Sequence, residues 1–406
     1  DADFVVARLE EVRRECTGPL GMSDPPNPAR GHYYNIYIHH RGDAFPDGWA
    51  CGQGTDCFGL PYLTLPGDGC HRTAKTLYHE AFHIFQYRAT SSGFSYSGVS
   101  QWYVEASAQW YMVRMRPSDS DVFIEASCIS MNPHLALWHT LENGEPTDAL
   151  DWLYMCRLYA LNTWLIYLTR VACVPSDVVT GGFYAGVTWS PQEHHLRRVG
   201  DPLRGHFADW AACNAGGLER GFRYLSGEQR ARAAQELEAV TRAGQSQVAN
   251  RHELAATLEA PLGEDALCFR PQAFAPRGWA YNVLLVRLPR AGPYTVVLRG
   301  DPEGTEGQAS HFLGRVVVGS RRHAMEMVDS RASWPCAVVV GEGEREMYVV
   351  VVSVPAHFGG NQEYGYEVEV RSGAWGTPGQ RSGGEAVASA AEMRRKRLEA
   401  LERRSG

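Results

Sequence analysis

Two histidines four residues apart, with a glutamate beside the first, form the segment of this sequence best suited to chemistry. His79-Glu80-Ala81-Phe82-His83 follows the pattern HExxH. Residues four apart share one face of a helix, so both imidazoles can bind a single metal ion. Glu80 can then accept a proton from a metal-bound water while the water oxygen attacks a carbonyl carbon. The motif predicts a hydrolytic zinc site with His79 and His83 as ligands and Glu80 as general base.

A catalytic zinc ion needs a third protein ligand and leaves its fourth position to water. Glu105 stands 22 residues after His83 on a second predicted helix and is the first candidate. Its neighbours Ala106 and Ala108 are small, which allows the two helices to approach closely. Glu125 is the alternative ligand. We favour Glu105 because its helix has the better start signal and the smaller neighbours.

The longer pattern HExxHxxGxxH is absent, because Gln86 and Ala89 occupy its glycine and final histidine positions, which argues against a metzincin. HEAFH followed by Glu105 in a WxxEAxA setting instead resembles the gluzincins, the thermolysin-like zinc peptidases. The resemblance implies zinc as the cofactor and a group four residues after the glutamate that supports a zinc-bound histidine. Gln109 stands there, with an amide in place of the usual carboxylate. Gln86, on the zinc face, is expected to make a structural hydrogen bond, with support of His83 as its alternative role.

The resemblance further implies an antiparallel edge strand beside the zinc that binds the extended substrate backbone. Leu60–Leu65 lies at the matching place in the chain, so Pro61, Tyr62 and Leu63 are the predicted substrate-binding residues. Gluzincins also use a tyrosine or a histidine to stabilise the oxyanion. The sequence leaves five candidates for that role, all in the following helical region: Tyr154, Tyr159, Tyr184, His194 and His195.

The segments around the motif have the periodicity that the site requires. Thr73–Arg88 and Gln101–Met115 carry apolar residues at helical spacing, so we expect two helices that contribute ligands. His32–His39 is aromatic and β-branched with alternation, which predicts a strand. Residues 133–175 contain at least one more long apolar helix, and residues 185–258 predict further helices with polar faces.

The character of the chain changes near residue 262. Residues 264–371 hold short runs rich in valine and tyrosine, separated by turn residues at regular intervals, which is typical of a β-sandwich. We therefore predict an α+β protein in three parts. Residues 1–262 form a zincin-like peptidase domain, with a small mixed sheet and its edge strand, the HExxH helix and a mostly helical second lobe. Residues 263–372 form the β-sandwich, and residues 373–406 form a glycine-rich linker with a charged tail that is either helical or disordered.

The composition is that of a folded protein with a sizeable core. Among 406 residues, 44% are hydrophobic and 21% are charged, and the net charge is −7. A net negative charge gives no support for binding to nucleic acid or to an anionic membrane surface. The sequence also has no apolar stretch long enough to span a bilayer. We therefore expect no nucleic-acid partner and no transmembrane segment.

Ten cysteines are scattered along the chain without any CxxC pair, which does not suit a structural zinc cluster. An even number spread over a large chain favours up to five disulfides in an oxidising compartment, so we expect a secreted or extracellular protein. Cys268 and Cys336 are the predicted pair of the sandwich. The alternative is a set of buried free thiols in a reducing compartment.

These patterns favour a zinc peptidase that hydrolyses peptide bonds in a protein or peptide substrate. The alternative is an extracellular binding or structural protein that keeps the metallopeptidase fold without catalysis. Glu80 counts against that alternative, because a decayed enzyme has no need of a general base. Substrate preference and oligomeric state depend on surfaces that the sequence does not define.

Overall fold

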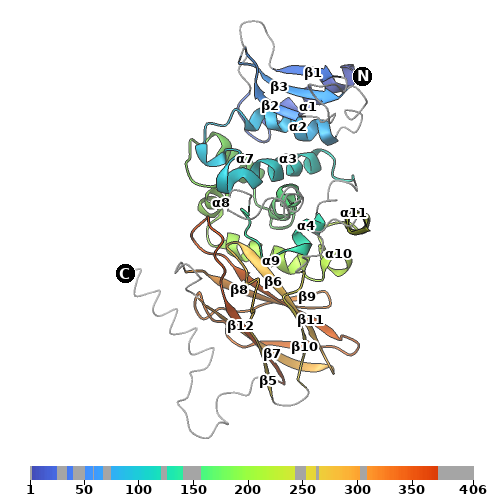
Figure 1. Cartoon of the computed structure of the whole chain (residues 1–406), viewed down its shortest axis with the longest axis vertical. Helices are drawn as coiled ribbons and strands as arrows, with labels where there is room; N and C mark the ends of the chain where they lie inside the picture. The colour runs from blue at the N-terminus through green and yellow to red at the C-terminus, as the bar shows by residue number, and fades with distance from the viewer. Residues whose placement is uncertain are drawn as a thin grey trace, which may run out of the picture.

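The computed structural model describes residues 2–24, 34–39, 51–57, 59–66, 75–119, 126–139, 157–242, 253–261, 265–301 and 309–373. The chain forms an elongated α+β molecule, which confirms the predicted class (Figure 1). A three-stranded sheet lies at one end, most of the helices fill the middle, and two larger sheets form the other end. No helix in these ranges is long and apolar enough to cross a membrane. The alternative ligand Glu125, the candidate Tyr154 and the tail from residue 374 onward lie outside the described residues.

The first sheet is mixed and has the strand order β1-β3-β2. Its strands are β1 (Asn35–His39), β2 (Cys51–Thr55) and β3 (Pro61–Pro66). Strand β3 pairs in parallel with β1 and antiparallel with β2, so it is the central strand. The prediction that this segment forms the edge strand is therefore wrong. Pro61 is compatible with a central position because it opens the strand, where a missing N–H costs the sheet least.

The two helices that carry the motif residues pack against one another beneath this sheet. They are α2 (Lys75–Gln86) and α3 (Gln101–Met115), joined through the 3-10 turns η2 (Ser92–Phe94) and η3 (Gly98–Ser100). Their ridges interlock through Phe82 and Tyr111, whose rings stack 4.6 Å apart. Ala106 and Ala108 on α3 are fully buried. Their small side chains allow neighbouring helices to approach closely. The N-terminal helix α1 (Ala2–Thr17) covers α2.

The remaining helices form the middle layer. They are α4 (Ala126–Met131), α6 (Asn162–Ile166), the π-helical turn η6 (Tyr167–Val171), α7 (Ser176–Thr180), η7 (Gly181–Tyr184), α8 (Pro191–Val199), α9 (Pro202–Asn214), α10 (Gly217–Arg220) and α11 (Gly227–Arg242). Part of the long apolar helix predicted within residues 133–175 is present but interrupted. It turns at Leu161 and ends in the π-helical turn, after which Cys173 adopts a positive φ of 55°.

Nine strands build the two larger sheets. They are β4 (Ala256–Glu259), β5 (Ala266–Phe269), β6 (Ala280–Arg287), β7 (Gly292–Gly300), β8 (Phe312–Val318), β9 (Arg321–Ala324), β10 (Cys336–Val340), β11 (Glu346–Ser353) and β12 (Tyr366–Ser372). One sheet has the order β4-β6-β11-β8-β9 and the other β10-β7-β12-β5. Their facing side chains, rich in valine, share one apolar core. Alternation along each strand explains why the two faces of the five-stranded sheet bury different sets of residues.

The outer face of the five-stranded sheet belongs to the core of the helical layer. Trp279, just before β6, and Tyr281, on β6, pack edge-on against Phe207 and Trp210 of α9, with ring centroids 5.3 and 5.7 Å apart. Trp164 of α6 joins the same aromatic cluster. The helices and this sheet are thus held by one continuous hydrophobic core rather than by a thin contact.

The cysteines correct the predicted set of disulfides. Cys128 is disulfide-bonded, whereas six described cysteines are free thiols, including Cys268 and Cys336. Cys268 lies on β5 and Cys336 on β10, the two outer strands of the four-stranded sheet. Two strands separate them, a distance of roughly 14 Å at about 4.8 Å per strand, and a disulfide requires Cα atoms within about 7 Å. The predicted Cys268–Cys336 pair is therefore wrong.

Candidate metal centre

Three predicted ligand atoms meet between α2 and α3. The Nε2 atoms of His79 and His83 lie 3.0 Å apart. Glu105 Oε2 lies 3.1 Å from His79 Nε2 and 3.5 Å from His83 Nε2. The structure thus brings together the three side chains that the sequence selected as one metal-binding group.

The triangle that these atoms form has the size that a zinc ion requires. A tetrahedral zinc with ligand distances of about 2.0–2.1 Å holds neighbouring ligand atoms about 3.3 Å apart. The observed separations run from 3.0 to 3.5 Å, so one ion reaches all three atoms without movement of either helix. Two imidazoles and one carboxylate are also a donor set that zinc accepts in catalytic sites. The residues therefore fit zinc in both geometry and chemistry.

The Glu105 carboxylate makes the space between the three ligands favourable for a positive charge. His79, His83 and Glu105 are buried, with exposed fractions of 7%, 3% and 6%. Burial disfavours the charged form of His83, but the adjacent Glu105 carboxylate outweighs that effect and raises the pKa of His83 to about 9. Burial likewise opposes ionisation of Glu105, yet the two imidazoles lower the pKa of its carboxyl group well below the usual value. The carboxylate thus stays ionised at neutral pH and available to a cation.

Gln86 sets the orientation of one ligand. Its Oε1 lies 2.5 Å from His83 Nδ1, and its Nε2 donates to the carbonyl of Val104 and to Ser107 Oγ at 2.9 and 2.8 Å. The Ser107 hydroxyl donates its hydrogen to the carbonyl of Tyr103, so it must accept from Gln86 Nε2. This fixes the amide with its oxygen toward His83, so Nδ1 carries a proton and Nε2 is the nitrogen on which a metal would take the place of a proton.

Gln109 does not take the supporting role that the resemblance implied. It is 7% exposed, hydrogen-bonds neither histidine, and its Oε1 is buried with no partner in the described part of the chain. The support comes instead from Gln86 on α2 and from Ser107 on α3. Ser107 was missed in the sequence, although a serine within a helix whose other central positions are largely apolar is itself a signal of a buried hydrogen bond.

The candidates for oxyanion stabilisation separate clearly. Tyr159 lies beside the cluster, with its ring centroid 5.8 Å from that of His79. Tyr184 donates to the carbonyl of Phe85, and His195 lies 2.9 Å from the Tyr103 hydroxyl, so both serve packing. His194 packs edge-on against the ring of Phe94, which in turn packs against Tyr103. Of the four candidates that lie among the described residues, Tyr159 is the one whose ring packs against a ligand of the candidate metal centre.

A second group of possible ligands has a different explanation. Cys268, Glu367 and Glu369 lie close together on β5 and β12. Both carboxylates are already engaged by arginines, since Arg299 binds Glu367 and Glu369 at 2.8 and 3.0 Å. The negative charge of both glutamates is thus already balanced by arginine. We assign no metal to this group.

The comparisons with known proteins offer no family. The sequence matches no protein-family profile and no curated protein. Two solved structures show slight similarity: a β-glucosidase from Paenibacillus barengoltzii, with a TM-score of 0.15, and a family GH115 4-O-methyl-α-glucuronidase, with a TM-score of 0.17. Both are 10% identical to this chain, over 48% and 88% of its length, and the chain covers 20% and 54% of theirs. Similarity at this level carries no argument about fold or function.

Proposed function

We propose that the protein is a zinc-dependent peptidase that binds zinc through His79, His83 and Glu105. The observation that supports this proposal most directly is the triangle of ligand atoms, with sides of 3.0 to 3.5 Å. A bound zinc ion lowers the pKa of a coordinated water and polarises the carbonyl of the scissile bond. The following steps concern the residues of the chain itself.

Glu80 is the proposed general base. It follows His79 directly on α2 and is half-buried, in contrast to the buried ligands on either side of it. A carboxylate in that position can accept the proton of the attacking water and later deliver it to the leaving amine. Tyr159, beside His79, is the proposed donor to the oxyanion.

Strand β2 is the proposed substrate-binding edge. It is an outer strand of the first sheet, pairs antiparallel with β3 and contacts the helix that carries both histidines. An outer strand can add the extended backbone of a peptide as one more strand, which suits a peptide substrate. This assignment replaces Pro61, Tyr62 and Leu63, which lie on the central strand.

The finer interpretation of the fold belongs to the same proposal. We infer that the first sheet, α2, α3 and the helical layer form a zincin-like domain, as expected for residues 1–262. The two larger sheets then form the β-sandwich of residues 263–372, an appendage that stabilises the enzyme or binds substrate. A secreted or extracellular location remains our expectation for such an enzyme.

Metal content and cleavage test the proposal together. The purified protein should contain about one zinc per chain by plasma mass spectrometry, and His79→Ala should lose it. Wild type should cleave members of a broad peptide library, and Glu80→Gln should retain zinc while its rate falls by a factor of about 10² to 10⁴. A protein that holds zinc but cleaves nothing would instead support the inactive binding protein. Absence of zinc from a folded chain would refute both.

A further inference from the structure

A cavity of about 110 Å³ lies between the helical layer and the five-stranded sheet, and the proposed peptidase site does not use it. Its walls come from α4, the end of α9, the Gly216-Gly217 turn, the segment before β4, and strands β6 and β11. An engineered cavity of about 150 Å³ admits benzene, so this space suits a ligand of about four to six heavy atoms. Leu254 at its wall is 36% exposed, which gives the cavity a side near solvent.

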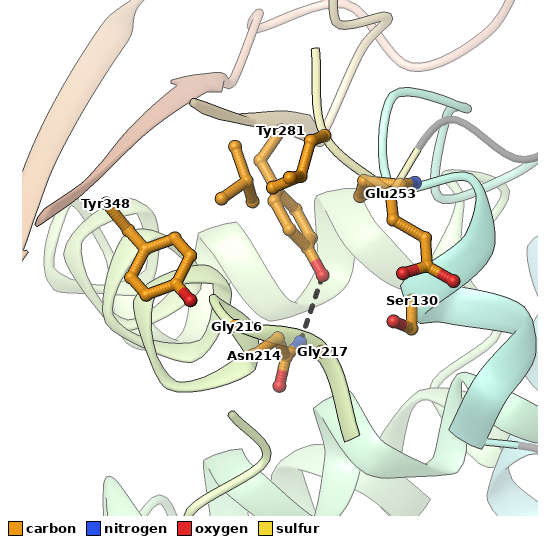
Figure 2. Close-up of a pocket in the computed structure, with 10 residues that line it drawn as sticks. Ser130, Asn214, Gly216, Gly217, Glu253, Tyr281 and Tyr348 are labelled. Carbon is orange, nitrogen blue, oxygen red and sulfur yellow. Dashed lines mark hydrogen bonds between the residues drawn. The ribbon is translucent and has the colours of Figure 1, made fainter. Parts of the chain in front are cut away.

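A chain of hydrogen bonds runs in one direction and ends in this cavity. Trp210 Nε1 donates to the Tyr224 hydroxyl at 2.9 Å, and that hydroxyl donates to Asn214 Oδ1 at 3.0 Å. Asn214 Nδ2 then donates to the Tyr281 hydroxyl at 3.1 Å, the bond drawn in Figure 2. Because the Tyr224 hydroxyl donates to Asn214 Oδ1, the amide of Asn214 presents its Nδ2 donor to Tyr281. The Tyr281 hydroxyl accepts this bond and makes no other among the described residues, so its own O–H can donate to a ligand in the cavity.

Ser130 presents a second polar group that its own structure does not satisfy. It is 8% exposed, yet its hydroxyl forms no hydrogen bond within the described part of the chain. The hydroxyl can therefore donate to, or accept from, a ligand that enters the cavity. A Cβ atom added at Gly217 would lie 3.4 Å from Ser130 Oγ and 4.0 Å from Glu253 Oε2. Both oxygens thus face the same small space beside Gly217.

Glu253 contributes a negative charge to the wall of the cavity. The other described residues that line the cavity are polar-neutral or apolar. Figure 2 shows its carboxylate next to the Ser130 hydroxyl, with Tyr348 on the opposite side and Tyr281 between them. A carboxylate beside tyrosine rings favours a cation, through direct charge pairing and through attraction to the ring faces.

We propose that this cavity binds a small primary ammonium compound with a hydrogen-bond acceptor next to its ammonium group, of the amino-alcohol class. The ammonium donates to the Glu253 carboxylate and to Ser130 Oγ, and the Tyr281 hydroxyl donates to the neighbouring oxygen of the ligand. The rings of Tyr281 and Tyr348 close the space around it. None of these residues belongs to the metal centre, so this is a second site whose binding does not depend on the peptidase proposal.

Four small probes test the proposal on the full-length protein by calorimetry or by ligand-detected NMR at neutral pH. Ethanolamine should bind once per chain, with a Kd on the order of tens of micromolar at best for four heavy atoms. Ethylene glycol has the same shape without the charge and should bind at least tenfold more weakly, and glycolate should not bind. Ethylamine, which lacks the acceptor, should also bind more weakly. Absence of ethanolamine binding, or equal binding of ethylene glycol, would overturn the proposal.

Variants then place the binding in this cavity. Glu253→Gln should weaken ethanolamine at least tenfold and remove its advantage over ethylene glycol, and Tyr281→Phe should remove its advantage over ethylamine. Glu259→Gln changes an exposed glutamate on nearby β4 and should leave binding unchanged. Since amines also coordinate zinc, the titration is repeated on His79→Ala, where ethanolamine should bind as before. Loss of binding in that variant, or full binding in a folded Glu253→Gln, would refute this site.

Discussion

Gln86 Oε1 lies 2.5 Å from His83 Nδ1, and the orientation of that amide is set by helix α3 rather than by its own helix. The carbonyl of Val104 and the hydroxyl of Ser107 both accept from Gln86 Nε2, and Glu105 stands between these two positions on α3. The helix that carries the third candidate ligand, Glu105, thus also aligns His83. Displacement of α3 would disturb the whole ligand triangle at once.

Replacement of Gln86 by leucine should therefore weaken zinc binding. Gln86→Leu has nearly the same volume but leaves His83 Nδ1 without its acceptor, so the imidazole loses its fixed tautomer and orientation. Loss of such a supporting group costs about 10-fold to 100-fold in metal affinity. Competition with a chromophoric chelator measures the change.

Gln109→Leu is the matched control for that variant. Gln109 is an equally buried glutamine one helical turn beyond Glu105, but it bonds to neither histidine. Its replacement should leave zinc affinity within about threefold of wild type. Equal losses in the two variants would show that the effect comes from helix packing and not from the Gln86–His83 bond.

Tyr159→Phe tests the proposed donor to the oxyanion. The ring that contacts His79 is retained, so zinc content should not change, while removal of one donor to the developing charge should lower kcat by about 10² to 10³. Tyr184→Phe removes a hydroxyl bound to the Phe85 carbonyl and should leave kcat unchanged. A Tyr159→Phe enzyme with normal kcat would remove Tyr159 from the mechanism.

Two adjacent glycines predict opposite effects on stability. A Cβ at Gly182 would lie 1.9 Å from the ring of Phe94, which packs against Tyr103 of α3. Gly182→Ala should therefore reduce the free energy of unfolding by about 1–3 kcal/mol, the usual cost of overpacking. Gly181 has open space around its Cβ position and ordinary helical backbone, so Gly181→Ala should be neutral or stabilising by about 0.4–1 kcal/mol. Denaturant unfolding of the two variants measures both values.

The sequence was informative where chemistry depends on local spacing. HExxH fixes its own geometry once it lies on a helix, and Glu105 followed from a second helix with small residues at the contact. The strand assignment failed because centre and edge are decided by a distant partner. Nothing within Pro61–Pro66 reveals that β1 pairs with it in parallel. The separation of Cys268 from Cys336 depends in the same way on strand order.

The supporting residues show the same limit. Gln86 was recognised as a polar residue on the metal-facing side of α2, but the choice between its two roles needed the positions of Val104 and Ser107 on another helix. Tyr159 could not be distinguished from the other tyrosines, because only tertiary packing brings it to His79. Long-range contacts, which the periodicity of the sequence does not show, distinguish these two residues from their neighbours.

Acid sensitivity follows from a histidine outside the metal centre. The Tyr103 hydroxyl donates to the Val179 carbonyl, so it must accept from His195 Nε2, and His195 Nδ1 is buried without a partner in the described part of the chain. Burial, and then the nearby His194, lower the pKa of His195 to about 3. In the unfolded chain His195 is protonated below about pH 6.5, whereas in the folded protein it stays neutral down to about pH 3. The folded state thus binds fewer protons in that window.

The free energy of unfolding should therefore fall as the pH drops from about 6.5 toward 3, by up to about 1.4 kcal/mol per pH unit for this one group. Above pH 6.5 the contribution of His195 to stability is complete. His195→Gln keeps a donor toward Tyr103 but cannot titrate, so its unfolding free energy should fall less steeply with acid than that of wild type. Urea unfolding at several pH values compares the two proteins, and parallel slopes for His195→Gln and wild type would show that His195 is not the group that limits stability in acid.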